Sequence, residues 1–168
     1  MPSNWYALYV KPHKEQSVND LLVANGITSF YPCLRVKPVN PRSRKIRPFF
    51  PGYIFVYLDL DEVGSNALRW TEGTYGLVTF GDEPAAVPEN LIHEVRRRVD
   101  EHNAAGGRQP PPMEPGDRVV IVDGVFQGYE AIFDADLAGQ DRVQVLLTYL
   151  SKHPKRLIIE SKQIKKKD

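Results

Sequence analysis

The sequence contains a single cysteine, Cys33, and no run of about 18 apolar residues. One cysteine cannot form an internal disulfide, so the fold does not depend on an oxidising compartment. Without a long apolar run we expect no membrane span, and the first residues, MPSNWYALYV, lack the charged-then-apolar leader of a signal peptide. These absences favour a cytoplasmic protein that does not enter a membrane, and we expect it to be a monomer.

Motifs of catalysis and metal binding are also missing. The four histidines lie far apart and none is near the cysteine, so the ligand spacing of a zinc site is absent. We find no Gly-x-Ser-x-Gly elbow, no phosphate-cradling glycine loop and no His-Glu-x-x-His. We therefore expect no cofactor and no catalysis. An unrecognised enzyme remains as an alternative, and it would need titratable groups that converge only in the fold.

The near-zero net charge of +1 hides one strongly basic stretch, which we call the basic arm. Residues 33–48 carry six cations and no acid. The cations are Arg35, Lys37, Arg42, Arg44, Lys45 and Arg47. Such a run is often a solvated loop. Because its six positive charges repel one another and no acid offsets them, binding to a polyanion or to an acidic partner surface is the alternative.

Residues 49–60, FFPGYIFVYLDL, are the stretch around which we expect the fold to be organised. Pro51 and Gly52 form a turn signal, and the following apolar run has the β-branched and aromatic composition of a strand. Side chains alternate between the two faces of a strand. One face therefore carries Ile54, Val56 and Leu58, and the other carries Tyr53, Phe55 and Tyr57. The aliphatic face suits packing on helices, whereas the aromatic face is either a second core layer or a docking surface.

The remaining pattern predicts an α+β fold in which helices pack on a mainly antiparallel sheet. The expected elements are a strand over 5–10, a helix over 13–25, a strand over 27–36, the central strand over 53–60, a short helix over 61–71, a strand over 73–80 and a helix over 88–102. Residues 105–114 have the Gly and Pro content of a linker between domains at 1–104 and 115–168. Strand-like runs at 117–123, 129–133, 142–150 and 156–160 predict a compact barrel beyond it.

In this order, the motifs resemble the NusG family of transcription elongation factors over nearly the whole chain. The matching motifs are WY at 5–6, FPGYIFV at 50–56, GLVTFG at 76–81, GDRV at 116–119 and GVFQGYEA at 124–131. The resemblance implies an N-terminal domain that binds RNA polymerase and a C-terminal five-stranded barrel of the KOW type. The turn of the KOW motif matches Gly124, Phe126 and Gly128.

The resemblance also implies site residues and partners. An apolar depression would lie over the tip of the polymerase clamp helices, and Ser65 and Asn66 would fall near a second polymerase contact. The positions that match the depression are Tyr9, Tyr53, Phe55 and Phe80. The bound domain would hold the clamp closed and suppress pausing, while the barrel would recruit the ribosome or termination factor Rho. The alternative is a KOW-type RNA- or ribosome-binding module that does not act on polymerase.

Within the family, residues 124–133 look closer to the specialised paralogue RfaH than to general NusG. RfaH-like proteins read non-template DNA, and Lys11 matches one such position. The further nucleic-acid candidates are His13 and Lys14 beside it, and Arg42, Arg44 and Lys45 in the basic arm. Glu72 stands where the resemblance implies a second arginine, and an acid there would repel DNA.

RfaH also hides its docking surface under a C-terminal domain folded as a helical hairpin. Two features of this sequence argue against such an arrangement. Pro154 falls in the second helix, where a proline costs about 3 kcal/mol. Arg47 replaces the carboxylate of an interdomain salt bridge and would face Arg142, a like charge. We therefore expect a constitutive barrel. The alternative, a helical hairpin covering the N-terminal domain, rests on the helical spacing of Val143, Leu146, Leu147 and Leu150.

Overall fold

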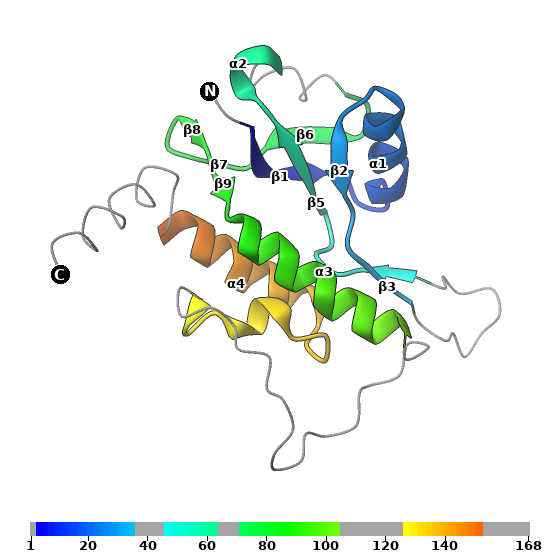
Figure 1. Cartoon of the computed structure of the whole chain (residues 1–168), viewed down its shortest axis with the longest axis vertical. Helices are drawn as coiled ribbons and strands as arrows, with labels where there is room; N and C mark the ends of the chain where they lie inside the picture. Colours follow the sequence, from blue (N-terminus) through cyan, green and yellow to red (C-terminus); the bar gives the residue numbers. More distant parts are fainter. Residues whose placement is uncertain (1–2, 36–45, 64–70, 105–125, 153–168) are drawn as a thin grey trace, which may run out of the picture.

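The computed structural model describes residues 3–35, 46–63, 71–104 and 126–152 (Figure 1). A five-stranded antiparallel sheet packs against α1 (Glu15–Ala24) on one face. The other face packs against α3 (Glu89–Ala104) and α4 (Gly139–Lys152). The expected α+β architecture, an antiparallel sheet with packed helices, is confirmed for this part of the chain.

The central strand of the sequence is central in the sheet as well. The sheet has the order β2-β5-β1-β6, with β9 also paired to β1. Its strands are β1 (Asn4–Val10), β2 (Thr28–Phe30), β5 (Tyr53–Leu58), β6 (Thr74–Leu77) and β9 (Ala86–Val87). The smaller elements are the ladders β3 (Cys33–Arg35) with β4 (Ile46–Pro48) and β7 (Thr79–Phe80) with β8 (Glu83–Pro84), and the helix α2 (Leu60–Val63).

The aliphatic face of β5 packs as predicted. Ile54, Val56 and Leu58 are buried in one cluster with Val18 and Leu22 of α1. The strand period of two and the helix period of 3.6 align these side chains without further constraint. Each such side chain contributes about 1.5–3 kcal/mol when it is fully buried, so this cluster anchors β5.

The turn before β5 is also where the sequence placed it. Gly52 has a φ of 85°, a conformation that glycine adopts without steric cost. The turn is tied in by two backbone hydrogen bonds, in which the Tyr53 N–H donates to Phe50 at 3.0 Å and the Val10 N–H donates to Gly52 at 2.8 Å. This fixes the register at which β5 leaves the turn to pair with β1.

The single strand expected over 27–36 is instead two strands, β2 and β3, which separate at Tyr31 and Pro32. Pro32 has no N–H to donate to a ladder, so it cannot continue a central pairing. Its carbonyl accepts from the N–H of Phe49 at 2.9 Å instead. The chain is thereby turned out of the main sheet into the β3–β4 ladder.

The strands expected over 129–133 and 142–150 are wrong for this structure. Residues 130–133 form a 3-10 helix, η3 (Glu130–Phe133), and residues 142–150 lie within α4. The helical alternative holds here because a helix brings Val143, Leu146 and Leu150 onto one buried stripe, whereas a strand would divide them between faces. α4 is described as far as Lys152, and Pro154, which was expected to interrupt this helix, lies outside the described residues.

Several predictions lie outside the described residues. They are the linker over 105–114, the strands over 117–123 and 156–160, and the turn residue Gly124. Of the other turn residues, Gly128 has a φ of 91° and its N–H donates to the Glu130 carboxylate at 2.9 Å. Phe126 is buried, so its side chain is a core residue in this arrangement.

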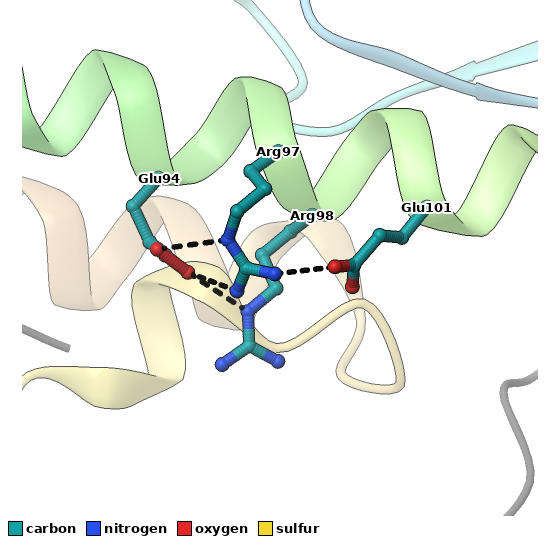
Figure 2. Close-up of polar contacts among 4 residues, drawn as sticks. All are labelled: Glu94, Arg97, Arg98 and Glu101. Atoms are coloured by element: carbon teal, nitrogen blue, oxygen red, sulfur yellow. Dashed lines mark hydrogen bonds and ion pairs between the residues drawn. The ribbon is translucent and has the colours of Figure 1, made fainter. Parts of the chain in front are cut away.

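Two of the three arginines of α3, Arg97 and Arg98, are paired with acids of the same helix (Figure 2). Arg97 pairs with Glu94 at 2.6 Å and also with Glu101, and Arg98 pairs with Glu94 at 3.2 Å. The hydrogen bonds that Arg97 donates to the Glu94 carboxylate are the main reason why the pKa of Arg97 is raised. These pairs have the (i, i+3) and (i, i+4) spacing of helix-stabilising contacts. Arg97 and Arg98 are thereby partly neutralised by Glu94 and Glu101.

Candidate functional site

The face of β5 opposite α1 carries aromatic side chains in three different environments. Its cross-strand pairs with β1 are Trp5 with Tyr57, Ala7 with Phe55 and Tyr9 with Tyr53. Phe55 has no exposed surface, whereas Tyr57 is 41% and Tyr9 is 43% exposed. This face, which we call the aromatic face, is therefore covered at its centre and open at both ends.

The centre of the aromatic face is covered by the C-terminal helices. The ring of Phe55 lies edge-on to Phe50, with the centroids 5.6 Å apart. It belongs to one buried cluster with side chains of α3, with Phe133 of η3, and with Leu146 and Leu150 of α4. Any partner that needs Phe55 must therefore displace part of this packing, to which α3 as well as η3 and α4 contributes.

The structure brings the four predicted docking residues onto one face. Tyr53 and Phe80 are half-buried against the cluster that contains Phe55, and the ring of Tyr9 stacks on that of Tyr53 at 5.0 Å. The other two predicted contact residues, Ser65 and Asn66, lie outside the described residues.

A third tyrosine, which the sequence did not reveal, extends this stack. Tyr75 is 48% exposed and its ring lies 4.7 Å from that of Tyr9. It sits at a register shift between β1 and β6, where Tyr9 pairs with Gly76 and Val10 pairs with Thr74. A β-bulge of this kind re-aims a side chain, and simple alternation cannot foresee that. We call Tyr53, Tyr9 and Tyr75 the tyrosine row.

Burial and a neighbouring phenol both act on Tyr53. Desolvation is the larger cause that raises the pKa of Tyr53, and the nearby Tyr9 raises it further. The Tyr53 phenol is therefore neutral over a wider pH range than a free tyrosine. At the far end of the row, the Lys11 Nζ lies 5.9 Å from the centroid of Tyr75, near the outer limit of a cation–π contact.

The basic candidates Lys11, His13 and Lys14 form an exposed turn between β1 and α1. The Lys14 N–H donates to the Lys11 carbonyl at 3.0 Å. His13 has a φ of 65°, which is uncommon for a residue with a side chain. Arg42, Arg44 and Lys45 lie outside the described residues, while Arg47 is exposed on β4.

Arg142 fastens the C-terminal helices to the N-terminal part, contrary to the expectation that Arg47 would repel it. Arg142 is only 3% exposed. Its Nε donates to the Phe49 carbonyl at 2.8 Å, and its Nη1 donates to the carbonyls of Asp134, at 3.0 Å, and Leu137. Backbone carbonyls thus replace the expected carboxylate. Burial lowers the pKa of Arg142, and Asp134 and Asp141 partly oppose this effect.

A glycine allows the first turn of α4 to approach the turn before β5. A Cβ atom placed on Gly139 would lie 2.7 Å from both Cδ and Cγ of Pro51. Real Cβ atoms do not come so close, and the proline ring cannot rotate away. Gly139 is therefore required by this particular packing of α4.

Comparison with known proteins identifies the family. A family model described as "Transcription termination factor nusG" matches residues 3–96, which include the sheet, α1 and the aromatic face. The chain belongs to the NusG family. Its matched part contains every described element that forms the tyrosine row and the turn of Lys11, His13 and Lys14.

The curated relatives of this NusG-family chain are distant. A transcription termination/antitermination protein NusG from Pseudomonas aeruginosa is 30% identical over 63% of this chain, and the match spans 60% of that protein. The NusG proteins of Chlamydia pneumoniae and Chlamydia trachomatis are each 26% identical over 86% of this chain and 84% of theirs. These relatives carry the NusG name, and the expected closer kinship with RfaH finds no support among them.

A solved structure described as "Domain interaction in Thermotoga maritima NusG" is 20% identical, with a TM-score of 0.45 over 71% of this chain and 70% of that one. Among the described residues, no group of three or more potential metal ligands comes together. No helix in those residues has the length and apolar character needed to cross a membrane.

Proposed function

We propose that this chain is a transcription elongation and antitermination factor that binds RNA polymerase through its aromatic face. Tyr9, Tyr53, Phe55 and Phe80 would receive the apolar tip of the clamp helices. The support is membership of the NusG family together with an aromatic surface that spans three strands. Rigid aromatic rings lose little conformational entropy on binding, so they suit a receptor for a helical tip.

The observation that carries the proposal is the covering of Phe55. A fully buried aromatic residue at the centre of an otherwise accessible aromatic surface is accounted for if the surface has two states, closed under α4 and open to polymerase. Polymerase would bind only the open state, so its apparent affinity would fall by the fraction of chains that are open.

A pair of substitutions tests this scheme. Gly139→Leu should release α4 through its clash with Pro51 and so strengthen polymerase binding in a pull-down, by about tenfold for a chain that is open a tenth of the time. Adding Phe55→Asp to Gly139→Leu should then abolish binding. Because α4 is already released in this background, the second change reports on docking and not on closure.

Gln140→Ala is the matched control, because Gln140 is exposed in the same helical turn. It should leave polymerase binding unchanged. Wild-type affinity in the double variant would remove Phe55 from the docking surface, and equal affinity in Gly139→Leu and wild type would remove α4 as a cover.

Two further contacts belong to the same proposal. Lys11 and Lys14, both exposed, would approach non-template DNA beside the polymerase, with His13 between them. The C-terminal segment, once released, would recruit the ribosome or Rho. Pull-down of ribosomes with a chain that does not capture polymerase would instead favour the alternative of an RNA- or ribosome-binding module.

A further inference from the structure

A cavity lies between the tyrosine row and the first turns of α4. Its volume is 590 Å³, within the range of about 300–1,000 Å³ that is usual for small-molecule sites. Tyr9 and Tyr53 line it from the sheet, and Gln140 and Val143 line it from α4. The site is therefore complete only when the C-terminal helices are in place.

The aromatic part of the lining suits a flat ring. The ring of Tyr53 lines the cavity and is held in place by the ring of Tyr9, which stacks on it with an angle of 19° between the two planes, so Tyr53 offers a pre-organised π surface. A base stacked on an aromatic side chain contributes about 1–3 kcal/mol in other proteins. Pro51 and Pro48 add rigid apolar walls.

The polar part of the lining carries both signs of charge. Arg47 and His13 line the cavity, and a guanidinium binds phosphate through two parallel hydrogen bonds. Glu15 also lines it, is only 5% exposed, and already accepts from the Gly52 N–H at 3.0 Å. A carboxylate has about four acceptor sites, so this group can still receive donors from a ligand.

His13 adds an independent sign of a functional site. Its φ of 65° lies in the left-handed region, which costs an L-residue roughly 1–2 kcal/mol. Glycine would fill the same turn position without strain. Strained residues with a side chain cluster at ligand sites, where the side chain matters more than the backbone cost.

We propose that this cavity binds a guanine nucleotide unit. The base stacks on the ring of Tyr53, and its adjacent N1–H and N2–H donors face Glu15. The phosphate meets Arg47 and His13. Adenine fits less well, because its N1 is an acceptor and would face the carboxylate. This goes beyond polymerase docking, and it makes the ligand a stabiliser of the closed state, since α4 forms one wall.

The nucleotide can come from solution or from an unpaired position in a strand, and calorimetry with the full chain separates these sources. The probes are GMP, AMP, inorganic phosphate, and a single-stranded thymidine hexamer with one central guanosine. We expect GMP to bind at least about tenfold more tightly than AMP, in line with the discrimination of a good pair of base contacts. Tighter binding of the hexamer than of GMP assigns the ligand to a strand, and the reverse assigns it to free nucleotide.

Three variants keep the test specific. Arg47→Ala should weaken GMP binding about tenfold through loss of the phosphate contact. Gln140→Trp should abolish it by filling the cavity, and because Gln140 is exposed this change is compatible with folding. Glu15→Gln, which keeps an acceptor for Gly52, should reduce the preference for GMP over AMP. Arg35→Ala and Tyr57→Leu, exposed residues outside the cavity lining, should have no effect.

The proposal is overturned if GMP and the hexamer both bind more weakly than about 1 mM, or if Arg47→Ala and Gln140→Trp bind GMP like wild type. Inorganic phosphate that binds as tightly as GMP would reduce the site to a simple anion contact, and this result would also reject the proposal. Because no polymerase is present, these outcomes are independent of the docking proposal.

Discussion

The guanidinium of Arg142 lies over the ring of Phe49, 4.1 Å from its centroid, while its Nε donates to the carbonyl of the same residue. Phe49 thus contacts Arg142 through both its ring and its backbone carbonyl. Burial alone disfavours the charged form, as the lowered pKa of Arg142 indicates. The carbonyl hydrogen bonds and the ring must offset that cost for α4 to stay in place.

Arg142→Lys should therefore open the chain. A lysine keeps the charge but cannot reproduce the planar fork or the stacking on Phe49. Each hydrogen bond from a charged group contributes about 1.5–3 kcal/mol, so loss of one shifts the closed–open equilibrium by tenfold or more. Polymerase pull-down and the loss of helical far-UV circular dichroism both report on it. Arg96→Lys is the control, because Arg96 also lies over a ring, that of Phe30, but is exposed.

Gly139→Ala should have a smaller effect in the same direction. A single methyl group at 2.7 Å from Pro51 forces α4 to shift by part of an ångström, whereas the leucine used above forces full displacement. We expect polymerase affinity to increase from wild type to Gly139→Ala and again to Gly139→Leu. A reversed order would show that helix propensity, which favours alanine over glycine by about 1 kcal/mol, dominates at this position.

Alkaline pH should destabilise the folded chain through Tyr53. The pKa of this phenol is raised above its ordinary value of 10.0, so the folded chain favours the neutral form. The contribution of the neutral Tyr53 phenol to the free energy of unfolding is complete below about pH 10, and it is lost as the pH rises through the pKa that Tyr53 has in the folded chain. Urea unfolding at about pH 8 and pH 10.5 should show a smaller pH effect in Tyr53→Phe than in wild type. Tyr57→Phe, at an exposed position, should behave like wild type.

Substitutions of His13 by glycine and by alanine should differ in stability but should weaken GMP binding alike. His13→Gly and His13→Ala both remove the imidazole, but only glycine relaxes a φ of 65°. We expect the glycine variant to be about 1 kcal/mol more stable than the alanine variant. Both should bind GMP more weakly than wild type. Equal stabilities, measured by thermal unfolding, would show that the turn is not strained.

The N-terminal fold could be predicted because its residues leave little choice. Ile54, Val56 and Leu58 alternate along the chain as the buried aliphatic face of a strand does, and Pro51 with Gly52 fixes where that strand starts. The aromatic face was recognised from the same alternation. Tyr75 was missed because the bulge beside Tyr9 breaks the period that sequence reasoning relies on.

The C-terminal segment could not be predicted in the same way. Val143, Leu146 and Leu150 satisfy a helix, and the β-branched and leucine-rich run around them also satisfies a strand. The choice depends on what each pattern packs against, here Phe55 and its neighbours, which lie some ninety residues away in the chain. The role of Arg142 was misjudged for a related reason: side-chain charges can be read from a sequence, whereas backbone carbonyls that accept hydrogen bonds cannot.

That last point has a genetic consequence. The three acceptors that hold Arg142 belong to the main chain of Phe49, Asp134 and Leu137, and every residue type supplies a carbonyl. A screen for substitutions that free the chain from its own cover should therefore return changes at Arg142, Gly139 and the Phe49 ring. Conservative changes at Asp134 and Leu137 should be nearly absent from it, although both residues touch the guanidinium as closely as Phe49 does.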